Sequence, residues 1–226
     1  RQLRYSGRMD EGRRDPGPVA KSQLRDALDA MLMGKAPEPA VTRPVGCSTK
    51  WAWKSDSVAA DNAAWEALPV GLDLLDAAAA AKLRANPTDK LRLVNLWSTG
   101  CAPCLAEFPE LVATYRRFQN RPFEFIPISL DAAADHAKVE KTLKREHAAV
   151  NPRGQRSIEE EGRKSNNYRF EGDADKLAEA IDAEWSGALP HSVLIAPGGG
   201  IVWRHNGAID PVELRRAIVK WMDENE

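Results

Sequence analysis

The sequence has few cysteines, no charge excess and no long apolar run, and each absence excludes a class of protein. Three cysteines among 226 residues are too few, and odd in number, for a disulfide-stabilised scaffold. A formal net charge of −1 gives no basis for general attraction to nucleic acid or to an anionic membrane. No apolar run approaches the roughly 20 residues that a transmembrane helix needs, and no signal peptide is evident.

Metal and nucleotide sites also lack their usual sequence patterns. A structural zinc site usually takes four Cys or His ligands, but the histidines are scattered, at His136, His147, His191 and His205. The "PGGG" stretch at 197–200 precedes no helix, so it is read as a hairpin turn and not as a phosphate-binding loop. We therefore expect neither a metal nor a cofactor.

Composition divides the chain into an N-terminal arm, residues 1–57, and a globular domain, residues 58–226. The arm has a loop-like Gly-, Arg- and Pro-rich stretch, a short amphipathic helix between Ser22 and Gly34, and a Pro-punctuated linker. Because the first residue is Arg1 and not Met, we expect the chain to come from a longer or processed protein.

Apolar periodicity in the domain predicts strands that alternate with helices. Strands are expected over 91–97 and 123–130, a polar surface loop over 153–167, and a hairpin over 193–205. Helices are expected over 58–68, 71–85, 102–118, 135–147, 173–182 and 210–222. This order predicts an α/β fold, a sheet with helices on both faces.

Two of the three cysteines, Cys101 and Cys104, form a Cys-x-x-Cys pair between a predicted strand and a predicted helix. The first sulfur then lies at a helix N-terminus, where free backbone N–H groups and the helix dipole stabilise a thiolate. Cys104 lies one turn further, close enough to attack a mixed disulfide on Cys101. An inert pair of core cysteines is the alternative, and the strand-to-helix position favours redox chemistry.

Two segments resemble the thioredoxin-fold TlpA/ResA-like thiol-disulfide oxidoreductases of the redoxin (AhpC/TSA) superfamily. They are "LVNLWSTGCAPCLAEFPEL", residues 93–111, and "EWSGALPHSVLIAPGGGIVWRHNGAID", residues 184–210. The resemblance implies a thioredoxin-like fold with a central mixed sheet flanked by helices and a central insertion between 135 and 185. It also implies a reductase of client-protein disulfides that is fed by a protein electron donor and works outside the cytoplasm.

By this resemblance, Cys101 is the exposed nucleophile and Cys104 the resolving thiol. Pro190 matches the cis-proline that faces the disulfide, and the backbone at Leu189 is expected to pair with an extended client. Glu107 matches an acidic residue near the thiols, where it could tune their pKa or accept a proton; a solvated helix charge is the alternative. Trp97, at the end of the strand, is counted as a supporting residue.

Three positions depart from the family pattern. Asn95 stands where thioredoxins carry a buried Asp, so that proton acceptor is missing. Gly100 replaces an aromatic residue, which predicts a less covered redox turn. His191 follows the proline, where it could stabilise a thiolate when protonated, although a simply exposed histidine is the more common case.

The N-terminal arm resembles, more weakly, the tail of a preceding redoxin domain. Cys47 could then relay electrons between two domains, and an inert linker cysteine is the favoured alternative.

Two other functions stay open for the whole chain. A thiol peroxidase would need a Pro-x-x-x-Thr-x-x-Cys context, which Cys104 lacks. A non-catalytic binding module would not need the intact cysteine pair.

Overall fold

The computed structural model describes residues 3–9, 22–42 and 55–225. Contacts divide the chain into two compact units, Arg1–Ser57 and Val58–Glu226, and each is considered by itself. Cys47, the possible relay thiol, lies outside the described residues.

The first unit contains helix α1 (Gln23–Leu32), which is the helix expected in the arm. Ser22 occupies the position before its first turn but makes no side-chain cap. Its hydroxyl donates instead to the carbonyl of Met9, at 3.2 Å. Gly34 follows the helix with a φ of 74°, a backbone conformation that glycine adopts without steric cost.

Strands and helices alternate along the second unit, as the apolar periodicity predicts. The strands are β1 (Asp73–Leu75), β2 (Leu91–Trp97), β3 (Phe123–Ser129), β4 (Tyr168–Phe170), β5 (His191–Ile195) and β6 (Ile201–Asn206). The helices are α2 (Ser55–Glu66), which begins just before this unit, α3 (Ala77–Ala85), α4 (Ala102–Phe118), α5 (His136–Arg145), α6 (Pro152–Glu160), α7 (Ala174–Ile181) and α8 (Pro211–Asn225), with short 3₁₀ turns η2 (Ala133–Asp135) and η3 (Pro197–Gly199).

The six strands form one mixed sheet in the order β1-β4-β3-β2-β5-β6. The pairs β1–β4, β4–β3 and β3–β2 are parallel, whereas β2–β5 and β5–β6 are antiparallel. The sheet therefore places β2, which leads into the cysteine pair, between β3 and the strand that follows Pro190. This mixed sheet, flanked by helices, confirms the predicted α/β thioredoxin-like fold class.

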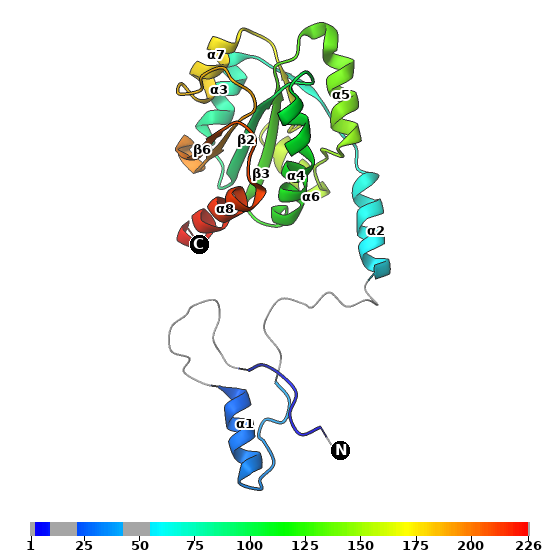
Figure 1. Ribbon diagram of the computed structural model, residues 1–226, viewed down its shortest axis with the longest axis vertical. Helices are drawn as coiled ribbons and strands as arrows, with labels where there is room; N and C mark the ends of the chain where they lie inside the picture. The colour runs from blue at the N-terminus through cyan, green and yellow to red at the C-terminus, as the bar shows by residue number, and fades with distance from the viewer. Residues whose placement is uncertain (1–2, 10–21, 43–54, 226) are drawn as a thin grey trace. The chain divides into compact units, whose positions relative to one another are not determined.

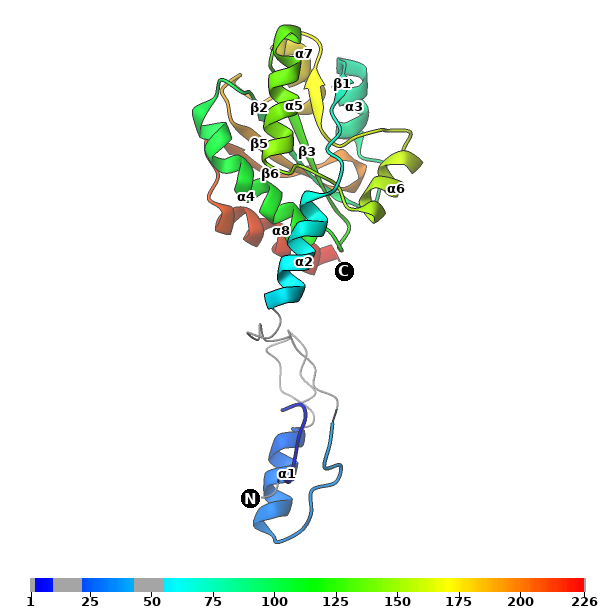
Figure 2. The same cartoon turned by 90° about the vertical axis from the view of Figure 1, so that its right-hand side faces the viewer.

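Helices cover both faces of the sheet (Figure 1), and Figure 2 shows α4 and α5 in front of the strands. Every residue of β2 is buried, as expected for a central strand with two covered faces. Alternate residues of a strand point to opposite faces. Leu93 and Trp97 thus pack in one hydrophobic cluster with α4 and α8, while Val94 and Leu96 pack in the other with α3 and α7.

Two of the secondary-structure predictions are wrong. Residues 71–85 were expected to form one helix, but β1 precedes α3 there, because the Asp76 side chain accepts the Ala79 N–H at 2.7 Å and starts the helix late. Residues 153–167 were expected to be a surface loop. Instead α6 forms after Asn151, whose Oδ1 accepts the Gly154 N–H at 2.7 Å.

The segment after α6 is also more buried than expected, because its polar side chains bond to buried carbonyls. Asn166 donates to the carbonyl of Phe125 at 2.8 Å, and Asn167 donates to that of Ala148 at 2.9 Å. The segment leads into β4, a strand that the periodicity did not reveal.

A buried charge network lies at the start of β2. The Arg92 guanidinium, 1% exposed, donates to Glu124 at 3.0 Å and to the carbonyl of Leu83 at 2.9 Å. Glu161 also accepts from Arg92, and it pairs with Lys90 at 2.6 Å. Arg163 donates to the other oxygen of Glu124, so charges of both signs alternate in this network.

Within the described residues, no helix is both long and apolar enough to cross a membrane.

Candidate active site

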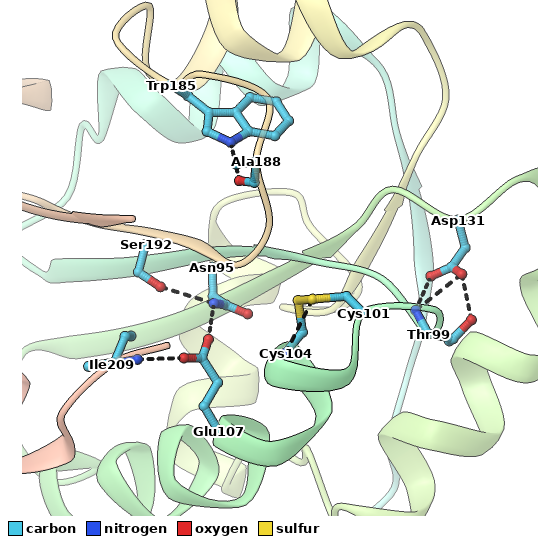
Figure 3. Close-up of a disulfide and its surroundings, with 10 residues drawn as sticks. All are labelled: Asn95, Thr99, Cys101, Cys104, Glu107, Asp131, Trp185, Ala188, Ser192 and Ile209. Atoms are coloured by element: carbon cyan, nitrogen blue, oxygen red, sulfur yellow. Dashed lines mark hydrogen bonds between the residues drawn. A yellow bond between two sulfur atoms is a disulfide. The ribbon is translucent and has the colours of Figure 1, made fainter. Parts of the chain in front are cut away.

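The cysteine pair lies at the start of α4 and forms a disulfide between Cys101 and Cys104 (Figure 3). Cys101 is the residue before the first helical turn, and Pro103 lies inside that turn, where its missing N–H is not needed. The Cys104 N–H donates to the Cys101 sulfur at 3.2 Å. This bond and the helix dipole would stabilise a thiolate on Cys101 after reduction.

The two cysteine residues differ in exposure. The Cys104 residue is fully buried, whereas Cys101 is partly exposed. The cysteine expected to be exposed is thus the more exposed of the two, and the roles of nucleophile and resolving thiol stay predictions. Gly100 is exposed, and a Cβ built on it would meet no atom within 4 Å, so this side of the turn is uncovered as expected.

Glu107 lies one turn beyond Cys104 on α4 and is only 6% exposed. Its Oε1 accepts from Asn95 at 3.1 Å and its Oε2 accepts from the Ile209 N–H at 2.8 Å. Burial raises the pKa of the Glu107 carboxyl, although both hydrogen bonds and the charge of His205 act in the opposite direction. The alternative of a solvated helix charge is wrong.

Asn95, on β2, links Glu107 to β5. Its Nδ2 donates both to Glu107 and to the Ser192 hydroxyl, the latter at 2.9 Å. Its Oδ1 is buried and has no hydrogen-bond partner. In Figure 3 this oxygen points toward the side on which the disulfide lies. Position 95 therefore has no carboxylate of its own, but the asparagine there donates a hydrogen bond to a carboxylate from α4, that of Glu107.

A second carboxylate, which the sequence did not reveal, holds the turn before Cys101. The Asp131 side chain accepts from the Thr99 N–H at 2.9 Å and from the Thr99 hydroxyl at 2.5 Å. The Ser129 hydroxyl also donates to it, at 2.6 Å. Asp131 follows the carboxyl end of β3. Ligands of open α/β sheets bind at the carboxyl ends of the strands, so the position of Asp131 after a predicted strand was the sequence signal that could have identified it.

Leu189 and Pro190 lie directly before β5. The peptide bond between them is cis, the isomer implied by the family resemblance. Pro190 is buried and Leu189 is partly buried. The Pro190 carbonyl accepts from the Gly207 N–H at 2.9 Å, so the strand pairing of β5 with β6 continues up to the proline.

His191 is fully buried, so the expectation of an exposed histidine is wrong. Its Nε2 lies 3.1 Å from an Asp182 oxygen and its Nδ1 lies 2.7 Å from the Asn206 Oδ1. Burial lowers the pKa of the imidazole against the effect of both partners. Because neighbouring residues of a strand face opposite ways, the ring points away from the face on which Ser192 bonds Asn95.

Trp97 is fully buried at the end of β2, with its ring centroid 4.9 Å from that of Phe108. Its Nε1 has no hydrogen-bond partner. The residue thus packs beneath the redox turn as part of the hydrophobic cluster that also contains Cys104.

Among the described residues, no group of three or more His, Cys, Asp or Glu side chains is arranged to hold a metal ion.

Comparison with solved structures finds thioredoxin-like chains. A thiol:disulfide interchange protein from a Bacteroides species is 22% identical over 63% of this chain and 77% of its own, with a TM-score of 0.41. The thioredoxin domain of a thiol-disulfide oxidoreductase from Bacteroides vulgatus is 25% identical over 59% and 79%, with a TM-score of 0.40. StoA from Bacillus subtilis is 14% identical over 58% and 84%, with a TM-score of 0.38.

No curated protein matches the sequence. A match to the AhpC/TSA family spans residues 73–204. It begins at β1, ends within β6, and so includes the disulfide, Glu107 and the cis-proline. The chain belongs to the AhpC/TSA family.

Proposed function

We propose that this protein reduces disulfides of client proteins through Cys101 and Cys104. The observation that carries the proposal is the asymmetry of the pair at a helix N-terminus. Cys101 is partly exposed and its sulfur accepts a backbone N–H, whereas Cys104 is fully buried, one helical turn before a buried carboxyl. This combination supplies a nucleophile, a resolving thiol and a proton acceptor in one place.

The reaction is a sequence of two exchanges. In the first, the Cys101 thiolate attacks one sulfur of a client disulfide, so that a mixed disulfide forms and one client thiolate leaves. In the second, the Cys104 thiolate attacks the Cys101 sulfur, the Cys101–Cys104 disulfide forms, and the second client thiolate leaves. The client gains two electrons and takes up two protons, and the protein loses the same number.

Glu107 serves as the proton acceptor for Cys104 in this scheme. Residues three apart on a helix lie on the same face, which places Glu107 next to Cys104. A carboxyl whose pKa is raised by burial is better matched to proton transfer near neutral pH than an exposed one. Asn95 and the Ile209 N–H hold its two oxygens, so the carboxylate keeps its orientation when it is ionised.

By the family resemblance, clients would dock as an added strand beside the backbone of Leu189. The partners are therefore proteins with exposed disulfides, and a separate protein thiol must restore the reduced state. We further propose an extracytoplasmic site of action, where client disulfides persist. A preceding redoxin domain and a relay through Cys47 stay predictions.

Trapping tests the proposal. In the Cys104→Ser variant, Cys101 attacks a client disulfide but nothing resolves the product, so a mixed disulfide should accumulate. Both variants also carry Cys47→Ser, so that each keeps a single thiol. Cys101→Ser is the matched control, since its one thiol, Cys104, is buried and should trap nothing. Equal trapping by both variants, or none by either, would contradict the assignment of roles.

The direction of electron flow has its own measurement. We expect the Cys101–Cys104 couple to equilibrate with dithiothreitol at a reduction potential near that of thioredoxin, about −270 mV. A value near −120 mV, typical of strong periplasmic oxidants, would reverse the proposed direction and leave the exchange chemistry intact.

A further inference from the structure

The segment between α7 and the cis-proline, residues 183–189, is exposed but closely organised. Ala183, Glu184, Ser186, Gly187 and Ala188 are exposed, and Leu189 is partly buried. The proposed docking backbone at Leu189 is the end of this segment. Its shape therefore decides whether a client strand finds its hydrogen-bonding groups in place.

Buried side chains join the two ends of the segment. Asp182, immediately before it, and His191, just after Pro190, lie 3.1 Å apart between carboxylate oxygen and ring nitrogen, and they are 4% and 0% exposed. Arg204 of β6 donates to both oxygens of the same carboxylate, at 2.5 and 2.7 Å. Asp182 thus ties the start of the segment to both strands of the β5–β6 hairpin.

Trp185 organises the interior of the segment. Its indole is buried and stacks on the His191 ring, with centroids 6.0 Å apart and planes inclined by 27°. Its Nε1 donates to the carbonyl of Ala188 at 2.7 Å, directly before Leu189. Figure 3 shows this bond within the loop that carries Trp185 and Ala188. Gly187 completes the turn with a φ of 84°, which a side chain would strain.

We infer that Asp182, Trp185 and His191 are positioning residues that preform the Leu189 backbone for capture of an extended polypeptide, so that the protein favours polypeptide disulfides over small ones. The inference rests on the proposed function and adds to it a preference for polypeptide disulfides over small ones. A preformed edge loses little conformational entropy when a client pairs with it, whereas a loose segment must first be ordered. A small disulfide without a peptide backbone cannot pair with Leu189 and gains nothing from this order.

The Trp185→Phe variant removes the Nε1–H donor and keeps an aromatic ring on His191. Trp65→Phe is a matched control, because Trp65 is also buried and its Nε1 donates to a backbone carbonyl, that of His147, at 3.1 Å. Both variants and the wild-type chain are reduced and mixed with two oxidants, an extended peptide disulfide and hydroxyethyl disulfide. Amide hydrogen exchange over 186–189 is measured on the same samples.

We expect Trp185→Phe to raise KM for the peptide about fivefold, the factor that corresponds to the net value of one hydrogen bond. The rate with hydroxyethyl disulfide should stay unchanged, and the amides at 186–189 should exchange faster. Trp65→Phe should behave as wild type in all three measurements. If Trp185→Phe slows both oxidants equally, or leaves the peptide reaction unchanged, the positioning role is refuted.

Failure of the proposed function gives a different result. A wild-type chain that reduces neither oxidant lacks the proposed exchange chemistry, and the selectivity falls with it. A wild-type chain that reduces both oxidants, with no selective effect of Trp185→Phe, retains the proposed function and refutes only the inference. Asp182→Asn provides a second variant, since it removes the charge that Arg204 and His191 share, and its peptide KM should rise at least as much.

Discussion

Replacement of Glu107 by Gln tests whether the buried carboxyl acts on the resolving thiol. The variant keeps the size of the side chain and one acceptor oxygen, so one of the two bonds from Asn95 and Ile209 can persist. What it loses is the ability to take a proton. The first exchange, by the exposed Cys101, should change little, and the second, by Cys104, should slow.

The size of the loss follows from thiol ionisation. An ordinary cysteine pKa of about 8.5 leaves about 3% thiolate at pH 7, so full deprotonation raises the reactive fraction about 30-fold. Cys104 is fully buried, and burial disfavours an unassisted thiolate further. We therefore expect Glu107→Gln to slow the second exchange by at least about 30-fold.

A single-turnover measurement separates the two steps, because each exchange releases one client thiol. Reduced protein is mixed with a peptide disulfide that bears a different reporter on each sulfur, and the two releases are followed in time. Glu110→Gln is the matched control. Glu110 lies three residues further along α4, but its side chain is 53% exposed and pairs with Arg215. Equal slowing of both releases, or an unchanged second release, would refute the role of Glu107.

Further predictions concern the groups around this carboxyl and the charge network. Asn95→Asp replaces the donor 3.1 Å from Glu107 with a second acid, so the shared proton should be held more tightly and the pH–rate profile of the second exchange should move to higher pH. Because burial raises the pKa of Glu107 from its ordinary value of 4.5, the free energy of unfolding should fall as pH rises from that value to the raised one, and urea titrations of Glu107→Gln should lack this component. Arg92→Ala removes one of the guanidinium groups that pair with Glu124, at 3.0 Å, and leaves the buried Leu83 carbonyl without this donor. It should cost about 3–5 kcal/mol of unfolding free energy; a loss within 1 kcal/mol, about that of a surface pair, would contradict this.

Local signals explain why the strand and helix that hold the cysteines could be predicted. β2 and α4 have the bounds that the sequence indicates, Leu91–Trp97 and Ala102–Phe118. An apolar run, a Cys-x-x-Cys turn and a helical repeat each depend on neighbours in the chain. The asymmetry between Cys101 and Cys104 also follows from position alone, since one precedes the first helical turn and the other faces the core one turn later.

The state of Glu107 could not be predicted in this way. Its donors come from β2 and from the loop before α8, and the Ile209 N–H is 102 residues away in sequence. Similarly, the partners of Arg92 come from β3 and from the segment after α6. A helix glutamate and a strand arginine look like surface residues until distant segments cover them, so pattern alone left Glu107 undecided and missed the network.

His191 and Ser192 show how one strand serves two purposes in the proposed site. The Ser192 hydroxyl bonds Asn95 on the face that carries Cys104 and Glu107. The His191 ring, on the opposite face, bonds Asp182 and stacks on Trp185. Because successive residues of a strand alternate between faces, the chemistry and the shaping of the docking edge come from adjacent residues yet depend on separate sets of partners. We therefore expect substitutions of Asp182 or Trp185, at the proposed docking edge, to leave the hydrogen bonds of Glu107 to Asn95 and Ile209 in place.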